Sequence, residues 1–136
     1  MNTIISWLKV GCSFLFGILG YFLGGFDPML TTLLIFMGID YLTGVLSATV
    51  YKKLNSRTGA KGIVKKIFML ILIGLANWVS VSTGVEGIRL LAISFYIANE
   101  GISIIENASK IGVPIPKKLK EVLEQLHKEG EWNGLS

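Results

Sequence analysis

A basic stretch between two long apolar runs constrains this chain more than any other feature of its sequence. Residues 51–66 hold six cations and no acidic residue. An apolar run of about twenty residues can cross a bilayer, whereas a short connector rich in Lys and Arg stays on the cytoplasmic side. We therefore predict a basic cytoplasmic loop over residues 51–66 that orients all other segments. Its cations, which we expect among lipid headgroups, are Lys52, Lys53, Arg57, Lys61, Lys65 and Lys66.

A soluble protein with a solvated basic loop, or with a patch for nucleic acid, is the alternative interpretation. The chain is 51% hydrophobic with a mean hydropathy of +0.62, which is at the top of the range for globular domains. Its net charge of +4 comes mainly from cations beside apolar runs. Anionic lipid headgroups are therefore favoured over nucleic acid as the partner of these cations.

The apolar runs predict an all-α integral membrane protein with three to four transmembrane helices. We expect a transmembrane domain over residues 1–110, with spans at about 4–26, 28–50, 64–84 and 88–107. The first run is the weakest, and it could lie at the interface instead of spanning. It has the length of a signal peptide, but Lys9 is its only basic residue and no small-residue cleavage site follows. We expect it to be retained.

Residues 111–136 are predicted to form a cytoplasmic amphipathic tail. Pro114 and Pro116 stop the last span, because proline disfavours helical geometry before it and cannot donate to a helix. A further helix begins near Pro116 and ends at Gly130, and it is too polar to span. It suits a headgroup layer or self-association. Its apolar face is formed by Leu119, Val122, Leu123 and Leu126.

The distribution of charge predicts that both termini lie in the cytoplasm. With four spans, the basic loop and the tail fall on the same side of the membrane. All but one of the 13 Lys and Arg residues then lie inside, and the exception is Arg89. A version with three spans, in which the first run does not insert, also keeps the loop and the tail inside.

Two of the predicted spans carry a polar stripe on an otherwise apolar helix. Asp40 lies near the middle of its span, where a carboxylate costs about 2.5–3.5 kcal/mol and is not expected to face lipid. Spacings of three and four residues place each set on one helical face. We expect these residues to line a pore or to make contacts between helices. They are Asp40, Thr43 and Ser47 in one span, and Asn99, Glu100, Ser103, Glu106 and Asn107 in the other.

Small residues predict close helix packing in two other places. Gly17, Gly20 and Gly24 share one face of the first run, and the last two form a GxxxG pair. Gly74 belongs to a weaker small-residue face in the third run. In lipid such faces let two backbones approach closely. Glycines of this kind can also be generic to membrane helices or mark a flexible kink.

No catalytic constellation and no metal-binding or phosphate-binding motif is visible in the sequence. Cys12 is the single cysteine and lies in an apolar run, and His127 is the single histidine and lies in a charged segment. We therefore expect no enzymatic activity, no metal and no cofactor. The ionisable residues Asp40, Glu100 and Glu106 remain the informative ones, because acids within spans mark ion paths, proton relays or helix contacts.

Several blocks of the sequence resemble the small phage holin family, which includes the holin-like proteins of toxin release. The resemblance covers about residues 36–126 and is weakest in the first span. The blocks are Gly38–Gly44, Lys52–Ser56, Gly59–Lys66, Phe95–Asn107 and Gly112–Lys120.

This resemblance implies a protein that oligomerises in the cytoplasmic membrane of the bacterial host and forms a non-selective lesion. An endolysin then reaches the cell wall and lyses the host, or a large toxin leaves, without direct binding to the holin being implied. The expected partners are other copies of the chain and the lipid bilayer. The alternatives are a small proton-coupled transporter that uses Asp40 or Glu100, and an antiholin-type regulator.

Overall fold

The computed structural model describes residues 1–131, which form five α-helices. These are α1 (Asn2–Leu23), α2 (Pro28–Val50), α3 (Ser56–Thr83), α4 (Ile88–Lys110) and α5 (Lys117–Gly130). The first four are long and apolar enough to cross a membrane. The prediction of an all-α, multi-pass membrane protein is confirmed.

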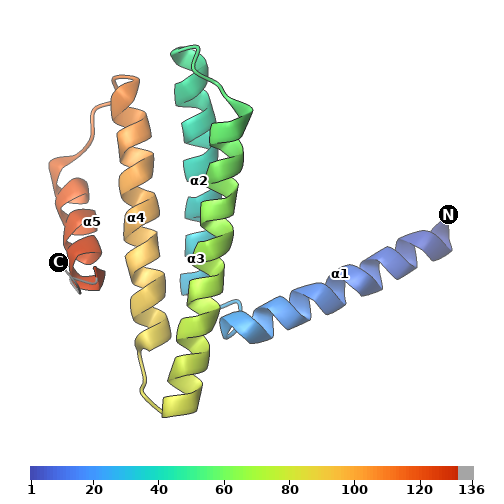
Figure 1. The fold of residues 1–136 in the computed structure, drawn as a ribbon. Helices are drawn as coiled ribbons and strands as arrows, with labels where there is room; N and C mark the ends of the chain where they lie inside the picture. Colours follow the sequence, from blue (N-terminus) through green and yellow to red (C-terminus); the bar gives the residue numbers. More distant parts are fainter. Residues whose placement is uncertain (132–136) are drawn as a thin grey trace.

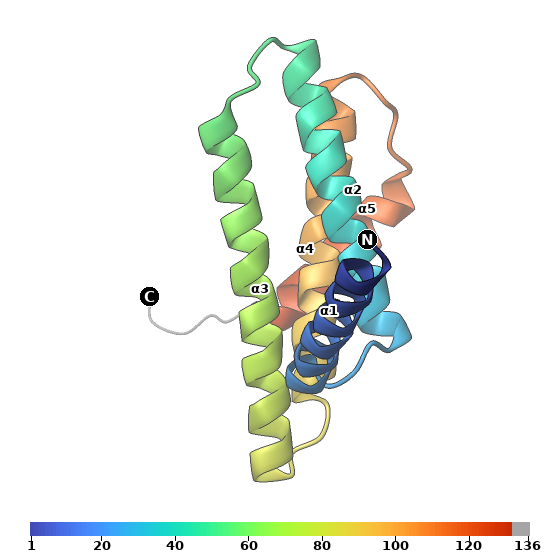
Figure 2. The ribbon, with the colours of Figure 1, turned by 90° about the vertical axis from the view of Figure 1, so that its right-hand side faces the viewer.

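Helices α2, α3 and α4 stand side by side as a three-helix bundle (Figure 1). The connection from α2 to α3 and the connection from α4 to α5 lie at the same end of this bundle (Figure 2). We call this end of the bundle the basic end, because the first cations of residues 51–66 lie there. We call the other end of the bundle the opposite end. Helix α1 points away from the bundle, whereas α5 runs back along α4 (Figure 1).

Side-chain caps fix where α2 and α3 begin. The Asp27 carboxylate accepts the backbone N–H of Leu30 at 2.9 Å, and Pro28 occupies the first turn of α2. The Asn55 side chain accepts the backbone N–H of Arg57 in the same way. Helix α3 therefore begins at Ser56, and only residues 51–55 connect it to α2. The predicted loop over residues 51–66 is too long, because the Asn55 cap starts the helix eight residues before the predicted span.

The apolar core of the bundle lies in the half toward the opposite end. Its fully buried side chains include Leu30 and Leu33 of α2, Ile73 of α3 and Ile93 of α4. Leu23, in the last turn of α1, belongs to the same cluster. The bundle is therefore held by close apolar packing over this half.

Large apolar side chains cover the outside of the helices. Phe14 of α1 is 71% exposed and Phe68 of α3 is 60% exposed, and similar side chains lie along all four long helices. A soluble monomer rarely exposes a contiguous apolar surface of this size. Lipid is the environment that such a surface fits.

The glycines predicted to pack helices fall into different environments. A Cβ atom at Gly74 would overlap the Phe22 ring of α1, and one at Gly20 would lie 2.9 Å from the Phe26 ring. Gly24 ends α1 with a φ of 84°, a left-handed conformation that favours glycine, and a Cβ atom there would lie 2.5 Å from Asn77 Oδ1 of α3 and 2.6 Å from Arg89 Nε of α4. A Cβ atom at Gly17 would meet no other atom within 4 Å. Close approach of α1 and α3 therefore depends on Gly74 and Gly24, and not on Gly17.

Replacement of Gly74 by alanine should destabilise the protein, whereas Gly17→Ala should not. The Gly74→Ala methyl group must displace Phe22, and overpacking of this kind costs about 1–3 kcal/mol. Gly17→Ala adds a methyl group to open space and improves helix propensity by up to about 1 kcal/mol. Thermal unfolding in detergent, followed by circular dichroism, measures both. Equal melting temperatures for the two variants would contradict the proposed contact.

Candidate functional site

Three charged side chains from three helices meet inside the bundle. The Lys66 ammonium of α3 donates to the Asp40 carboxylate of α2 at 2.7 Å and also to the Glu100 carboxylate of α4. The Glu100 side chain is 2% exposed, and those of Asp40 and Lys66 are 15% exposed. We call these three residues the ion cluster.

The ion cluster lies at one level of the bundle. Asp40 precedes Val50 by ten residues, Lys66 follows Ser56 by ten, and Glu100 precedes Lys110 by ten. At 1.5 Å of rise per residue, each group lies about 15 Å from the basic end of its helix. The hydrocarbon core of a bilayer is about 30 Å thick. The cluster is therefore near the middle of the span, where unpaired charges are most costly.

An amide on α4 continues the polar contacts toward the basic end. The Asn107 Nδ2 group donates to Asp40 Oδ1 at 3.3 Å and to Thr43 Oγ1 at 3.1 Å. The Thr43 hydroxyl in turn donates to the backbone carbonyl of Asp40 at 3.1 Å. We call the ion cluster together with Thr43, Ser47 and Asn107 the polar seam between α2 and α4.

The remaining stripe residues lie at different distances from this seam. Ser47 is buried and lines a hollow of about 370 Å³ between α2 and α4, together with Asn107. Asn99 and Ser103 are half-buried, and Glu106 is exposed. The structure thus brings together Asp40, Thr43, Glu100 and Asn107, and it leaves Glu106 outside the cluster.

The sequence predicts that Lys66 reaches lipid headgroups, whereas the structure places it between two carboxylates. The neighbouring Lys65 is exposed, as are Lys52, Lys53, Arg57 and Lys61. The sequence contains one signal for this role of Lys66. Asp40 in the second span and Glu100 in the fourth need a compensating cation within the membrane. Lys66 is the cation of the basic stretch that lies deepest in the third apolar run.

A second polar cluster closes the opposite end of the bundle. Arg89 of α4 donates to the Leu23 carbonyl at 2.6 Å, to the Gly25 carbonyl at 2.9 Å and to the Asp27 carboxylate at 2.6 Å. It therefore caps free carbonyls at the end of α1 while pairing with the residue that caps α2. Asn77 of α3 adds a hydrogen bond to the Phe22 carbonyl at 3.2 Å. The sequence shows Arg89 only as the one cation predicted on the outer side of the membrane, and the structure gives it this clamping role.

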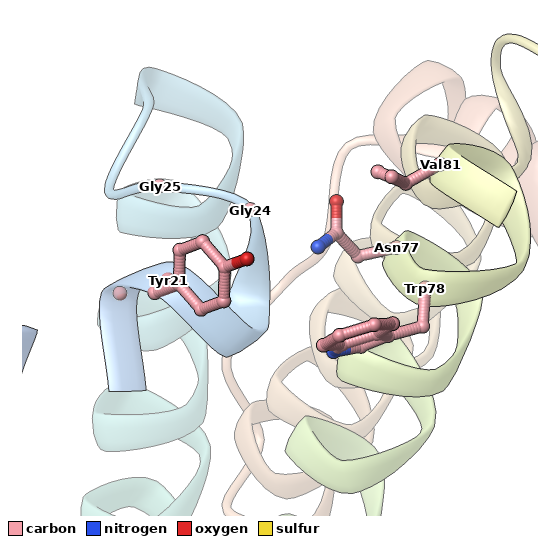
Figure 3. Close-up of a pocket in the computed structure, with 7 residues that line it drawn as sticks. Tyr21, Gly24, Gly25, Asn77, Trp78 and Val81 are labelled. Atoms are coloured by element: carbon pink, nitrogen blue, oxygen red, sulfur yellow. The ribbon is translucent and has the colours of Figure 1, made fainter. Parts of the chain in front are cut away.

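A second hollow opens at the junction of α1 and α3. Its volume is about 530 Å³. In Figure 3, Tyr21 and the glycines at the end of α1 lie on one side of it, and Asn77, Trp78 and Val81 of α3 lie on the other. The Tyr21 and Trp78 rings make an edge contact, with their centroids 6.5 Å apart. Within residues 1–131, no group of three His, Cys, Asp or Glu side chains is placed to hold a metal ion.

The groups of the ion cluster can form ion pairs and can bind protons. Two carboxylates and one ammonium carry a formal net charge of −1 when all three are ionised. The Lys66 ammonium lowers the cost of burying both acids, and it ties α3 to α2 and to α4. The cluster can therefore hold the bundle together, take up a proton, or contact water if the helices separate.

Comparisons with known proteins give a consistent result. The sequence profile described as the bacteriophage holin family matches residues 17–128. An uncharacterized 14.9 kDa protein encoded in the nagH 3′ region of Clostridium perfringens is 42% identical over 129 residues, which are 93% of this chain and 98% of that protein. An uncharacterized protein of Halalkalibacterium halodurans is 35% identical over 136 residues, covering 93% and 96% of the two chains. The uncharacterized YqxH of Bacillus subtilis is 39% identical over 112 residues, covering 82% and 79%. No solved structure matches the chain.

Loss of the ammonium at the ion cluster should destabilise the bundle strongly. Lys66→Met leaves two buried carboxylates without a counter-charge, and removal of one partner from a buried ion pair costs about 3–5 kcal/mol. Lys65→Met is the matched control, because Lys65 is exposed on the same turn of α3. The double variant Lys66→Met/Glu100→Gln should recover part of the loss. Unfolding in detergent measures all three, and a Lys66→Met protein as stable as Lys65→Met would contradict the assignment.

The clamp at the opposite end should make stability depend on pH. The Arg89 guanidinium, which donates to the carboxylate, holds the pKa of Asp27 below its ordinary value, and the Leu30 N–H acts in the same direction. A lowered pKa in the folded state contributes stability above the ordinary pKa of about 4, and this contribution is lost as the pH falls through the lowered pKa.

The difference in melting temperature between the wild type and Asp27→Asn isolates this contribution from the titration of other acids. It should be largest near neutral pH and should shrink below about pH 4. Melting curves between pH 7 and pH 2 measure it. A difference that stays constant over this range would show that the Asp27–Arg89 pair does not contribute.

Proposed function

Because the chain belongs to the bacteriophage holin family, we propose that it acts as a holin. Copies of the protein assemble in the cytoplasmic membrane of the bacterial host and open a non-selective lesion. An endolysin then reaches the cell wall, or a large toxin leaves the cell, without binding to the holin itself. Members of this family are generally not enzymes, and the proposal requires no catalytic step and no cofactor.

The polar seam between α2 and α4 is the observation that carries this proposal. In one subunit, Asp40, Lys66 and Glu100 satisfy each other and Asn107 bonds to Asp40, so that the seam is stable within lipid. Its groups are also suited to water, because each can exchange its partner for solvent when α2 and α4 separate. A closed subunit and a wetted, open subunit are therefore both accessible to the same side chains.

The size of the chain requires that any wide opening be made by several subunits. A ring of subunits related by symmetry can enclose water, with polar faces turned toward the centre and apolar faces toward lipid. The exposed apolar surface of α1, including the small face around Gly17, is available for contacts between copies. Gly20 and Gly74 are already in contact with Phe26 and Phe22 within the subunit.

The charges support an orientation with the basic end in the cytoplasm. Lys52, Lys53 and Arg57 lie exposed at this end, and Lys110 lies exposed at the end of α4. At the opposite end, Arg89 is paired with Asp27. The positive-inside tendency then favours a cytoplasmic position for the connection of residues 51–55 and for the connection between α4 and α5.

A small proton-coupled transporter is the second candidate, and the ion cluster favours it. With a formal net charge of −1, the cluster can bind one proton without gaining a net positive charge. A transporter would give saturable flux of a specific solute while the membrane potential persists. A holin would instead abolish the potential and release solutes regardless of their identity.

Expression of the protein alone in bacteria should stop growth and admit a membrane-impermeant dye, because a non-selective lesion ends dye exclusion. Co-expression of a cytoplasmic enzyme that degrades the cell wall should then cause lysis. Dye uptake and optical density measure both effects. Normal growth and dye exclusion at high levels of protein in the membrane would contradict the holin proposal, and delayed lysis by another holin on co-expression would favour a regulator.

The Asp40→Asn variant tests the part played by the seam. It removes the carboxylate through which Lys66 ties α3 to α2, which destabilises the closed subunit, so the onset of dye uptake should be earlier than in the wild type. Glu106→Gln is the matched control, because Glu106 is a stripe residue that is exposed outside the seam. Equal onset for Asp40→Asn and the wild type would show that the seam does not open.

A further inference from the structure

Helix α5 is docked against α4 through specific close contacts. Leu123 of α5 is buried, and a Cβ atom at Gly101 would lie 3.0 Å from its Cδ1. A Cβ atom at Gly130 would lie 2.7 Å from the Cβ of Phe95. The His127 ring stacks on Phe95, with centroids 4.9 Å apart and planes 18° apart. Gly130 therefore permits an approach that a Cβ atom would block, and Gly101 leaves room for Leu123 that a Cβ atom would crowd.

The contacts place α5 at the depth of the span. Gly101 and Phe95 precede Lys110, the last residue of α4, by nine and fifteen residues. At 1.5 Å per residue, these contacts lie about 13 Å and about 22 Å from the basic end. Both values fall within a hydrocarbon core of about 30 Å. Figure 1 shows α5 running back along α4 from the basic end. The sequence predicts this helix at the membrane surface or in self-association, and it does not predict docking along α4.

The outer face of docked α5 is too polar for lipid. At about 100° per residue, Gln125 lies about 200° around the helix from the buried Leu123. The side chains that share the outer arc with Gln125 are mostly exposed, and each charged one would cost about 2.5–3.5 kcal/mol in the middle of a bilayer. They are Lys117, Lys118, Glu121, Glu124, Lys128 and Glu129. Docked α5 therefore needs water on its outer face.

We propose that docked α5 lines the aqueous lumen of the assembled lesion. This inference rests on the proposed holin function, and it identifies the element that meets the solutes passing through. The outer arc carries Lys and Glu in equal number, three of each, which suits a lumen that does not select by charge. The flanking side chains Leu119, Val122 and Leu126 are 50%, 47% and 37% exposed, and they meet the neighbouring subunit or lipid beside the lumen.

The test uses the full chain in liposomes, with Cys12→Ser as the background because Cys12 is exposed. Release of a trapped dextran first establishes that the protein forms a lesion. Failure at this stage would count against the proposed holin function itself. The position of α5 is then examined only in preparations that leak.

Disulfide cross-linking measures whether α5 is docked in the open lesion. Phe95→Cys with His127→Cys joins the contact of the two stacked rings, whose centroids lie 4.9 Å apart, and adds no side chain at Gly101 or Gly130. We expect cross-linking within a subunit and an unchanged rate of dextran release after oxidation. The same protein under reducing conditions controls for folding. Absence of this cross-link in leaking liposomes, or loss of the leak on oxidation, would overturn the proposal.

Thiol reactivity measures whether the outer face is wet. Charged thiol reagents attack the thiolate, which forms in water and not in hydrocarbon. Gln125→Cys should therefore react in leaking liposomes. The matched control is Leu75→Cys, on the outside of α3, where Leu75 is 56% exposed among apolar side chains and should face lipid. A Gln125→Cys protein that is cross-linked in its docked form and is as unreactive as Leu75→Cys would overturn the proposal.

Discussion

The contact of one ammonium with two carboxylates is the interaction on which the bundle depends. Lys66 binds Asp40 and Glu100 at a depth where each charge alone would be expelled from lipid. Since the three residues come from three helices, the contact fixes the rotation of α2, α3 and α4 about their axes. Apolar packing around Leu33 and Ile73 holds the other half of the bundle but does not specify rotation as strictly, since many apolar faces can pack together.

Local signals in the sequence are sufficient to predict the helices and several of their boundaries. Asp27 and Pro28 mark the start of α2, Asn55 marks the start of α3, and the prolines after Lys110 separate α4 from α5. Such caps act over a few residues, so that a sequence shows them directly. The run of small and polar residues around Gly59 is typical of a loop. In the structure it forms the first turns of α3, because the Asn55 cap starts the helix before it.

The partners within the site could not be predicted, because they depend on which helix faces which. Periodicity places Asp40 and Glu100 on polar faces, but it does not show that Lys66 reaches both. Nor does it show that Arg89 turns toward the end of α1. For the docking of α5, Gly101 is the one signal in the sequence. A glycine within a long helix can mark a site where another segment approaches closely, as Leu123 of α5 does here.

Helices α2 and α4 run in the same direction and both end at the basic end, where the Tyr51 hydroxyl donates to the Lys110 carbonyl. Their aligned peptide dipoles therefore bring partial negative charge, about half an elementary charge for each helix, to that end. Lys52, Lys53 and Lys110 lie beside these two termini. The lysines thus neutralise the ends of the helices beside which they lie as well as any surface that they meet, and added salt should weaken both effects together.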